Sequence, residues 1–179
     1  MNLYSKLNCE RLSLLPIVKI SALLGLLFGG VSINADEVSD RMAIADVLTQ
    51  YSYRWDGKDA AGFADLFTED AIMEQHVNGE LTTGSRVVGR NAIYEYALES
   101  HRGRLADRQT RHHFSGLVFI ELSAESAVTE NMALITHQTA ADSAPVNRSS
   151  GIYRNTWRKT SAGWRISTRI LMLDRFSAR

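Results

Sequence analysis

Three polar side chains in this sequence have the types and positions that acid–base chemistry needs. Asp56 ends an apolar run of helical period and stands directly before Gly57, which predicts a carboxylate at the C-terminal end of a helix. The helix dipole disfavours negative charge there, so either a solvated DGKD turn or a buried partner must account for it. His113 and His137 lie on two later segments, each as the titratable member of a mainly apolar strand face.

A carboxylate that bonds one imidazole nitrogen fixes the tautomer and raises the basicity of the other nitrogen. We therefore predict an Asp56–His113 pair in which His113 removes a proton from a substrate carbon or hydroxyl. His137 would polarise a carbonyl or assist the leaving group. Three tyrosines either donate to a substrate oxygen in the same pocket or simply pack in the core or at its rim: Tyr51, Tyr53 and Tyr153.

Other kinds of site are open to the same residues. His113, His137 and Asp56 make a two-histidine, one-carboxylate set of the kind that binds non-haem iron, although no H-x-D or H-E-x-x-H spacing supports it. A serine nucleophile lacks the G-x-S-x-G elbow. Each histidine could also be a satisfied core residue without any function. We predict that the site uses neither a metal nor an organic cofactor.

A helix must carry Asp56, and two strands must carry the histidines. Apolar residues at steps of three and four predict a helix from about Asp40 to Trp55, with shorter helices at 60–67 and 91–100. DAIMEQHV predicts a strand that turns at Asn78-Gly79. From residue 112 the period becomes two, which predicts four consecutive strands. Helices segregated from a mainly antiparallel sheet indicate an α+β fold, in which a curved sheet wraps around the N-terminal helices as a cone.

Period two also predicts which side chains share a face. If both histidine-bearing faces are concave, the two imidazoles enter the cavity that the end of the first helix closes. The first predicted face comprises His113, Ser115, Leu117 and Phe119. The second comprises Ala133, Ile135, His137 and Thr139. The outer face could instead serve assembly, through Val118, Ile120, Leu134 and Leu171.

The first 35 residues have the order of a secretory signal: basic residues, an apolar run and the small residue Ala35. Lys19 leaves that run too short to span a bilayer comfortably at about 20 residues, and the alternative is an uncleaved anchor. We expect a signal peptide over residues 1–35, cleaved near Ala35, and a domain over residues 36–179 that is periplasmic or secreted, without a membrane contact once the leader is removed. The single cysteine, Cys9, lies in the leader, so the domain has no disulfide.

The numbers and positions of charged residues indicate which kinds of partner the chain could bind. Twenty Lys and Arg balance twenty Asp and Glu, so the composition does not indicate a nucleic-acid partner. One segment, from Arg102 to Arg111, is rich in arginine and has no apolar period. Such a stretch is typically a solvated loop, and the alternative is a mobile lid that attracts an anionic ligand.

Over residues 39–176 the chain resembles the SnoaL-like, NTF2-like superfamily. The resemblance is carried by the opening DRMAIADVLTQYSYRWDGKDAAGFADLFTEDAIME and by VVGRNAI, RHHF and GWRISTRI, in that order. It implies a cone of helices against a strongly curved sheet, assembled as a homodimer or homotrimer. The superfamily includes enzymes and binding proteins, so the fold alone does not decide the function.

Within the superfamily, the pattern is most similar to scytalone dehydratase and lindane dehydrochlorinase. Asp56 in WDGKD resembles their aspartate, His113 in RHHF resembles the histidine that it bonds, and counting brings the dehydratase's second histidine onto His137. Trp55 and Gln75 stand where the dehydratase holds a water between two tyrosines. The dehydrochlorinase has a lysine at the position of Tyr51, so neither substrate carries over.

The resemblance and the residues together predict a cofactor-independent lyase, of the dehydratase or dehydrohalogenase type, or an isomerase. It would act by His–Asp general base catalysis on a small hydrophobic cyclic or hydroxy-carbonyl compound. The predicted substrate-binding residues are Tyr51, Tyr53, Trp55, Gln75 and Tyr153. The alternative is a non-catalytic protein that binds a hydrophobic small molecule in the same cone.

Overall fold

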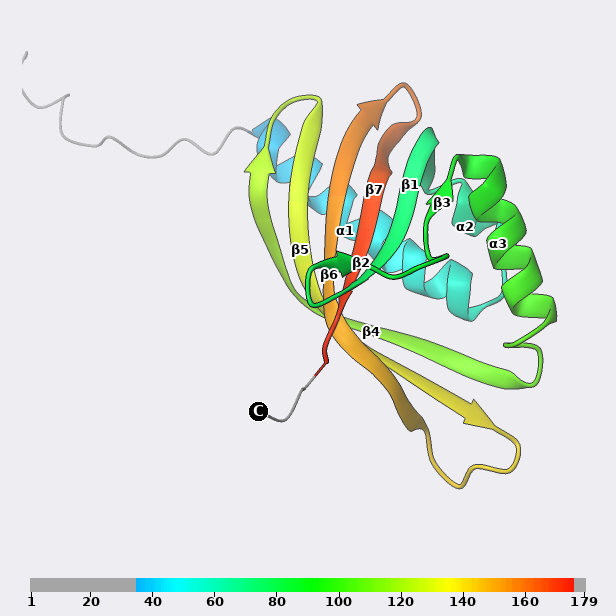
Figure 1. Ribbon diagram of the computed structural model, residues 1–179. Helices are drawn as coiled ribbons and strands as arrows, with labels where there is room; N and C mark the ends of the chain where they lie inside the picture. Colours follow the sequence, from blue (N-terminus) through cyan, green and yellow to red (C-terminus); the bar gives the residue numbers. More distant parts are fainter. Residues whose placement is uncertain (1–34, 176–179) are drawn as a thin grey trace, which may run out of the picture. The chain divides into compact units, whose positions relative to one another are not determined.

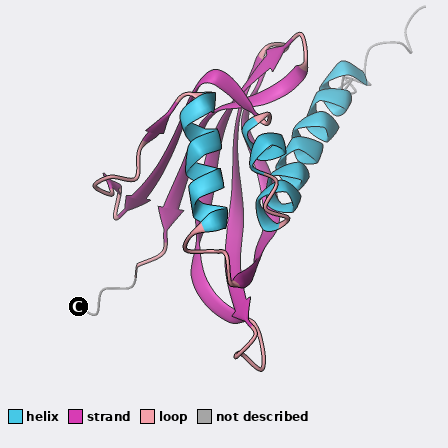
Figure 2. Cartoon of the chain, turned by 90° about the vertical axis from the view of Figure 1, so that its right-hand side faces the viewer, coloured by secondary structure: helices cyan, strands magenta, loops and turns pink. Residues whose placement is uncertain are grey.

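The first helix, α1 (Ala35–Asp56), lies along the concave side of a curved sheet (Figures 1 and 2). The computed structural model describes residues 35–175, so the predicted leader lies outside the described residues except for Ala35, its last residue. The predicted apolar stripe of α1 is buried, with Ile44 fully inaccessible and Trp55 only 7% exposed. Among the described residues, no helix combines the length and the apolar character needed to cross a membrane.

Two further helices and seven strands complete the described chain. They are α2 (Ala60–Ala64), β1 (Phe67–Val77), β2 (Glu80–Leu81), β3 (Val87–Val88), α3 (Arg90–Arg102), β4 (Arg108–Leu122), β5 (Ser126–Thr139), β6 (Val146–Thr160) and β7 (Gly163–Leu173). The sheet order is β2-β1-β7-β6-β5-β4, and β3 pairs with β1. Only β1 and β7 run parallel. The predicted α+β fold with a curved, mainly antiparallel sheet is confirmed.

Most element boundaries follow the local sequence signals. Asn78 and Gly79 both have positive φ, as a tight hairpin turn requires, and they join β1 to β2 as predicted. The predicted second helix is shorter than expected, because Phe67 already belongs to β1. The arginine-rich segment is only partly a loop, since β4 begins at Arg108.

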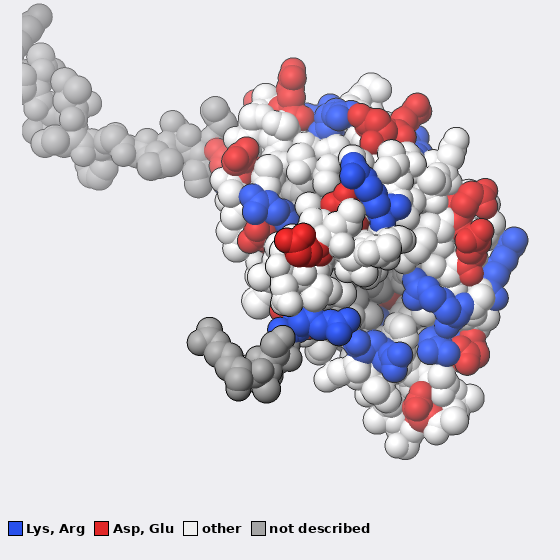
Figure 3. Space-filling view, viewed as in Figure 1, with Lys and Arg blue, Asp and Glu red and all other residues white. Residues whose placement is uncertain are grey.

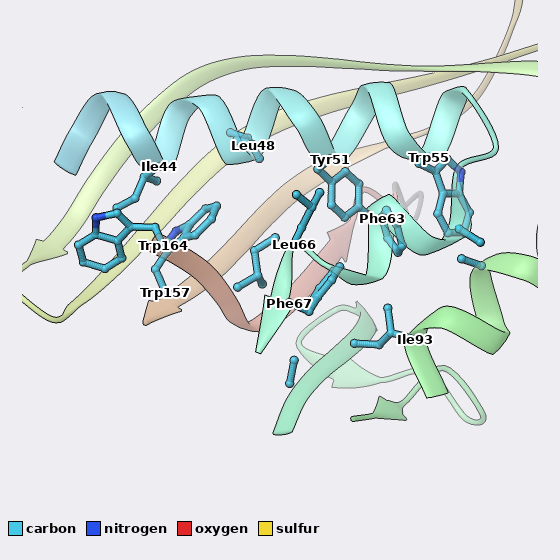
Figure 4. Packing of buried hydrophobic residues seen from close by; sticks show 14 of the residues in the cluster. Ile44, Leu48, Tyr51, Trp55, Phe63, Leu66, Phe67, Ile93, Trp157 and Trp164 are labelled. Carbon is cyan, nitrogen blue, oxygen red and sulfur yellow. The ribbon is translucent and has the colours of Figure 1, made fainter. Parts of the chain in front are cut away.

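Aromatic side chains fill the space between α1 and the sheet (Figure 4). Trp157 and Trp164 are almost completely buried, and each indole N–H has a partner. Trp157 donates to Thr129 Oγ1 and Trp164 donates to Asp40 Oδ1, both at 2.8 Å. These two bonds remove the cost of burying a polar edge, so the tryptophans pack the core as their sequence positions predict.

A β-bulge in β4 decides which residues of that strand face the helices. Ser115 pairs with Met132 but Val118 pairs with Glu130, so β4 carries one extra residue between them. Gly116 lies at this point with a φ of 63°. Because an extra residue reverses the alternation, the predicted face that ran unbroken from residue 113 to residue 119 is wrong. Leu117 and Phe119 pack against the core, but the inward residues before the bulge are His112 and Phe114.

The outer face of the sheet exposes apolar side chains. Val118, Ile120 and Leu134 are between 39% and 53% exposed, as the sequence predicts. Leu171 is only 7% exposed and belongs to the interior, so its predicted place on the outer face is wrong. The homodimer or homotrimer stays a prediction.

Gly116→Ala is expected to destabilise the protein by about 1–2 kcal/mol, because a left-handed backbone is costly for any residue with a Cβ. The new Cβ would lie 2.9 Å from the flexible Cε of Met132, which can move aside. Urea denaturation measures the loss. Gly84→Ala is the comparison: Gly84 also has a positive φ but open space around it, so it should show a loss of similar size if the backbone and not the Met132 contact is the cause. A Gly116→Ala protein as stable as the parent would contradict the assignment of the bulge to this glycine.

Candidate active site

The carboxylate of Asp56 closes the end of α1 against β4. Its Oδ1 accepts the hydroxyl of Thr110 at 2.7 Å and the Nδ1–H of His112 at 2.8 Å. Its Oδ2 accepts the backbone N–H of His112 at 2.8 Å. The side chains of Asp56 and His112 are only 8% and 6% exposed. Three donors from β4 therefore compensate for a negative charge at the unfavourable end of a helix.

These contacts also fix the ionisation of the pair. Burial raises the pKa of Asp56, but the hydrogen bond and charge of His112 and the bonds from Thr110 and the His112 backbone outweigh it, so the pKa lies below the usual 3.8. Asp56 is thus a carboxylate at neutral pH and can only accept hydrogen bonds. His112 must carry its proton on Nδ1, which leaves Nε2 as the basic nitrogen.

The predicted partner of Asp56 is wrong by one residue. His113 faces the opposite side of β4 and is exposed, and its Nε2 lies 3.4 Å from Thr136 Oγ1. The bulge at Gly116 is the reason, because the alternation set by Leu117 and Phe119 cannot be extended back through it. The prediction from the sequence did not select His112, which is the first residue of the same HHF segment and the actual partner of Asp56.

The His112 ring lies among aromatic side chains of the interior. Its centroid is 6.0 Å from that of Tyr51 and 6.2 Å from that of Trp55, both in edge-to-face geometry. His112 Nε2 bonds no other described residue. It is also not among the fully buried nitrogens without a partner, which in the described chain belong to His101, His137 and Arg169. Nε2 is therefore an unbonded nitrogen that is not completely enclosed, as proton transfer to it requires.

Two hollows lie near the pair. An outer one of about 490 Å³ runs past Asp56, Tyr53 and the edge of β4, and His112 contributes to its wall. An inner cavity of about 230 Å³ lies between the helices and the concave face of the sheet. Tyr51 and Trp55 line the inner cavity, so the ring of His112 packs directly against its wall.

The inner cavity brings together most of the predicted substrate-binding residues. Its lining includes Tyr51, Trp55, Gln75, Tyr153 and His137. Their roles in binding stay predictions. Tyr53 is misplaced in the prediction, because it is 74% exposed on the outer side of α1, two residues after the buried Tyr51. A helix turns 100° per residue, so residues two apart point in nearly opposite directions.

His137 enters the cavity on the same face as His112. In the β4–β5 pairing His137 is opposite Thr110 and Ile135 is opposite His112, so the two imidazoles are diagonal neighbours. Nδ1 of His137 is buried and has no hydrogen-bond partner in the described chain. Burial lowers the pKa of His137, and the charges of Arg108 and Arg148 lower it further. His137 is therefore neutral at pH 7 and can donate a hydrogen bond to a ligand.

Arg169 is a buried cation that the sequence pattern did not reveal. Its side chain is fully inaccessible, and its Cζ lies 3.5 Å from the ring centroids of both Tyr51 and Tyr153. Nη1 donates to Asn155 Oδ1 at 2.8 Å, but Nε and Nη2 have no partner among the described residues. Stacking on a ring contributes about 2 kcal/mol when desolvated, whereas burying an ion costs several kcal/mol.

A second irregularity explains why Arg169 was missed. Ile166 pairs with Trp157 but Thr168 pairs with Thr156, so β7 carries an extra residue at Ser167. Simple alternation from Trp164 and Ile166 would place Arg169 in solvent. The signal that could have found it is downstream, because Arg169 alternates with the apolar Leu171 and Leu173 of the cavity wall.

The iron site considered from the sequence is not assembled. His113 faces away from both Asp56 and His137, because it lies on the other face of β4. Across the described residues, no group of three or more His, Cys, Asp or Glu side chains is placed to hold a metal ion.

Comparisons with known proteins agree with this fold. The family described as a SnoaL-like domain matches residues 36–170. No curated protein matches the sequence. Rv3472 from Mycobacterium tuberculosis, whose function is unknown, is 26% identical and superposes with a TM-score of 0.69 over 83% of this chain and 79% of its own.

Two solved structures from Novosphingobium aromaticivorans are also similar. An NTF2-like protein with a cystatin-like fold is 22% identical, with a TM-score of 0.66 over 79% of this chain and 86% of its own. A candidate scytalone dehydratase is 22% identical, with a TM-score of 0.65 over 80% of this chain and 92% of its own. At this identity the two structures establish the fold alone.

Proposed function

This chain belongs to the SnoaL-like domain family, and from that premise we propose that it is a lyase of the dehydratase type, or an isomerase, with His112 as its general base. The observation that carries the proposal is the buried hydrogen bond between Asp56 Oδ1 and His112 Nδ1. The candidate scytalone dehydratase among the similar structures favours the elimination. The special likeness to lindane dehydrochlorinase stays a prediction.

The substrate we propose is a small cyclic or hydroxy-carbonyl compound with an acidic hydrogen next to a carbonyl. Nε2 of His112 takes that proton, and the electron pair of the C–H bond moves onto the carbonyl oxygen. Asp56 stabilises the imidazolium that forms, as an orienting carboxylate does in other histidine bases. In a dehydratase the electron pair on the oxygen then moves back toward carbon and expels the β-hydroxyl. The hydroxyl takes the proton from the imidazolium and leaves as water.

Residues that line the inner cavity, against whose wall the His112 ring packs, would stabilise the negative oxygen. His137 is neutral and can donate from its ring N–H, and burial raises the pKa of Tyr153, so the phenol keeps its proton and can also donate. Donors fixed in a dry site stabilise a developing charge without reorganisation. In an isomerase the same oxyanion would collapse by taking the proton back at a different carbon.

Proton exchange in D₂O tests the proposal whatever the leaving group is. Cyclic ketones and β-hydroxy ketones are incubated with the protein in D₂O and followed by proton NMR. The proposal expects loss of the signal next to the carbonyl, or appearance of an alkene signal, at a rate that depends on the protein. A protein that binds such compounds and changes none of them would be the hydrophobic binding protein of the alternative.

His137→Asn should lower turnover about 10- to 100-fold, less than the loss of a general base, because it removes one polarising donor while the base stays in place. Steady-state kinetics on a substrate from the D₂O screen measures the change. The control is His113→Asn, because His113 is exposed on the opposite face of β4 and does not line the inner cavity. Equal turnover in the parent and His137→Asn would remove His137 from the mechanism.

A further inference from the structure

The charge of Arg169 has no counter-ion in the described part of the chain. None of its nitrogens bonds a carboxylate: Nη1 donates to the amide oxygen of Asn155, and Nε and Nη2 are unpaired. A tyrosinate cannot balance it either, because burial raises the pKa values of both Tyr51 and Tyr153. The guanidinium is therefore a positive charge held against two neutral phenol rings.

The unpaired nitrogens lie on one side of the guanidinium. Nε–H and the adjacent N–H of Nη2 point in parallel, and their spacing matches the two oxygens of a carboxylate. The third nitrogen, which bonds Asn155, is the one that cannot take part in this edge. The two unpaired N–H groups of Arg169 therefore form the edge that binds a carboxylate side-on.

The cavity wall adds positive rather than negative charge. Arg104 also lines the cavity, and its partners are the neutral hydroxyls of Tyr96 and Ser100 at 3.1 Å each. Among residues 35–175, Glu74 is the only acidic residue in the lining, and His76 and Arg86 already bond it at 2.8 and 3.3 Å. Figure 3 shows Lys and Arg side chains beside a hollow on the face drawn in Figure 1.

We propose that the ligand of this cavity is a compact cyclic compound that carries a carboxylate, and that the Nε–Nη2 edge of Arg169 binds it. The inference deepens the proposed function and rests on it in placing the substrate in the inner cavity. Both nitrogens are sealed from solvent, so a cavity side chain must turn aside as the carboxylate reaches them. Binding then replaces an unpaired buried cation with a bidentate ion pair.

The test compares benzoate with benzamide, a neutral compound of nearly the same shape. Isothermal titration calorimetry of the unmodified protein should show benzoate binding at least tenfold more tightly than benzamide. Arg169→Met should abolish this preference, because methionine fills space without charge. Arg165→Met is the matched control on the same strand: Arg165 donates to the carbonyl of Trp164 and does not line this cavity, so the preference should persist.

Benzoate binding no tighter than benzamide binding in the unmodified protein overturns the inference, and this comparison does not depend on whether Arg169→Met folds. A preference that survives in folded Arg169→Met also overturns it. The proposed function fails separately. His112→Ala should keep the preference for benzoate while it loses turnover, and a protein that prefers benzoate but converts no substrate would contradict the chemistry alone.

Discussion

His112→Ala should lower turnover about 100- to 10,000-fold, the range that a general base typically contributes, whereas His113→Ala should change it less than about twofold. The two histidines are adjacent in the sequence but lie on opposite faces of β4. His112 bonds the buried carboxylate of Asp56, and His113 is exposed on the outer side. Single-turnover and steady-state kinetics on a substrate found by NMR would measure both effects.

This pair of variants is its own control, because both remove an imidazole from the same strand. His112→Ala also takes a ring from a packed aromatic cluster, so circular dichroism and thermal unfolding should first establish that it is folded. His112→Gln is a second variant that preserves much of the volume. Full activity in a folded His112→Gln protein, or a large loss in His113→Ala, would contradict the assignment of His112 as the general base.

Asp56→Asn should lower turnover by a similar 100- to 10,000-fold and should also destabilise the fold at pH 7 by about 3 kcal/mol. The carboxylate accepts three hydrogen bonds with its two oxygens, from Thr110 and twice from His112. A carboxamide has one oxygen, so at least one donor would face an NH₂ group. The imidazolium formed in the reaction would also lose its counter-charge.

The stability difference should depend on pH with a defined sign. The folded-state pKa of Asp56 lies below 3.8, so its stabilising effect is present above the unfolded-state value and is lost as the pH falls through the folded one. Urea denaturation of the parent and Asp56→Asn should therefore give unfolding free energies that approach each other as the pH falls below the unfolded-state value of 3.8 and through the lower folded-state pKa.

Thr110→Val is the milder companion variant, because it removes one neutral donor and keeps the shape of the side chain. It should cost about 1 kcal/mol and leave most of the activity. An Asp56→Asn deficit that is as large at pH 3 as at pH 7 would show that the carboxylate charge is not what stabilises this end of α1.

The sequence by itself determined the elements and the chemical inventory. The apolar stripe of α1 needs only the helical period, and the Asn78-Gly79 turn needs only the conformational preferences of two residues. The position of Asp56 as the last residue of α1 agrees with the prediction from Gly57, although the residue with the left-handed φ is Lys58. These features depend on neighbours in the chain, and local physics is enough to set them.

Only the tertiary structure decided which side chains meet. One extra residue near Gly116 exchanges His113 for His112 as the partner of Asp56, and one at Ser167 brings Arg169 inside. A bulge forms where two strands must bend over the same helices, so its position depends on the partner strand and the core beneath it. Because strand side chains alternate with a period of two, a single unpaired residue reverses every assignment beyond it.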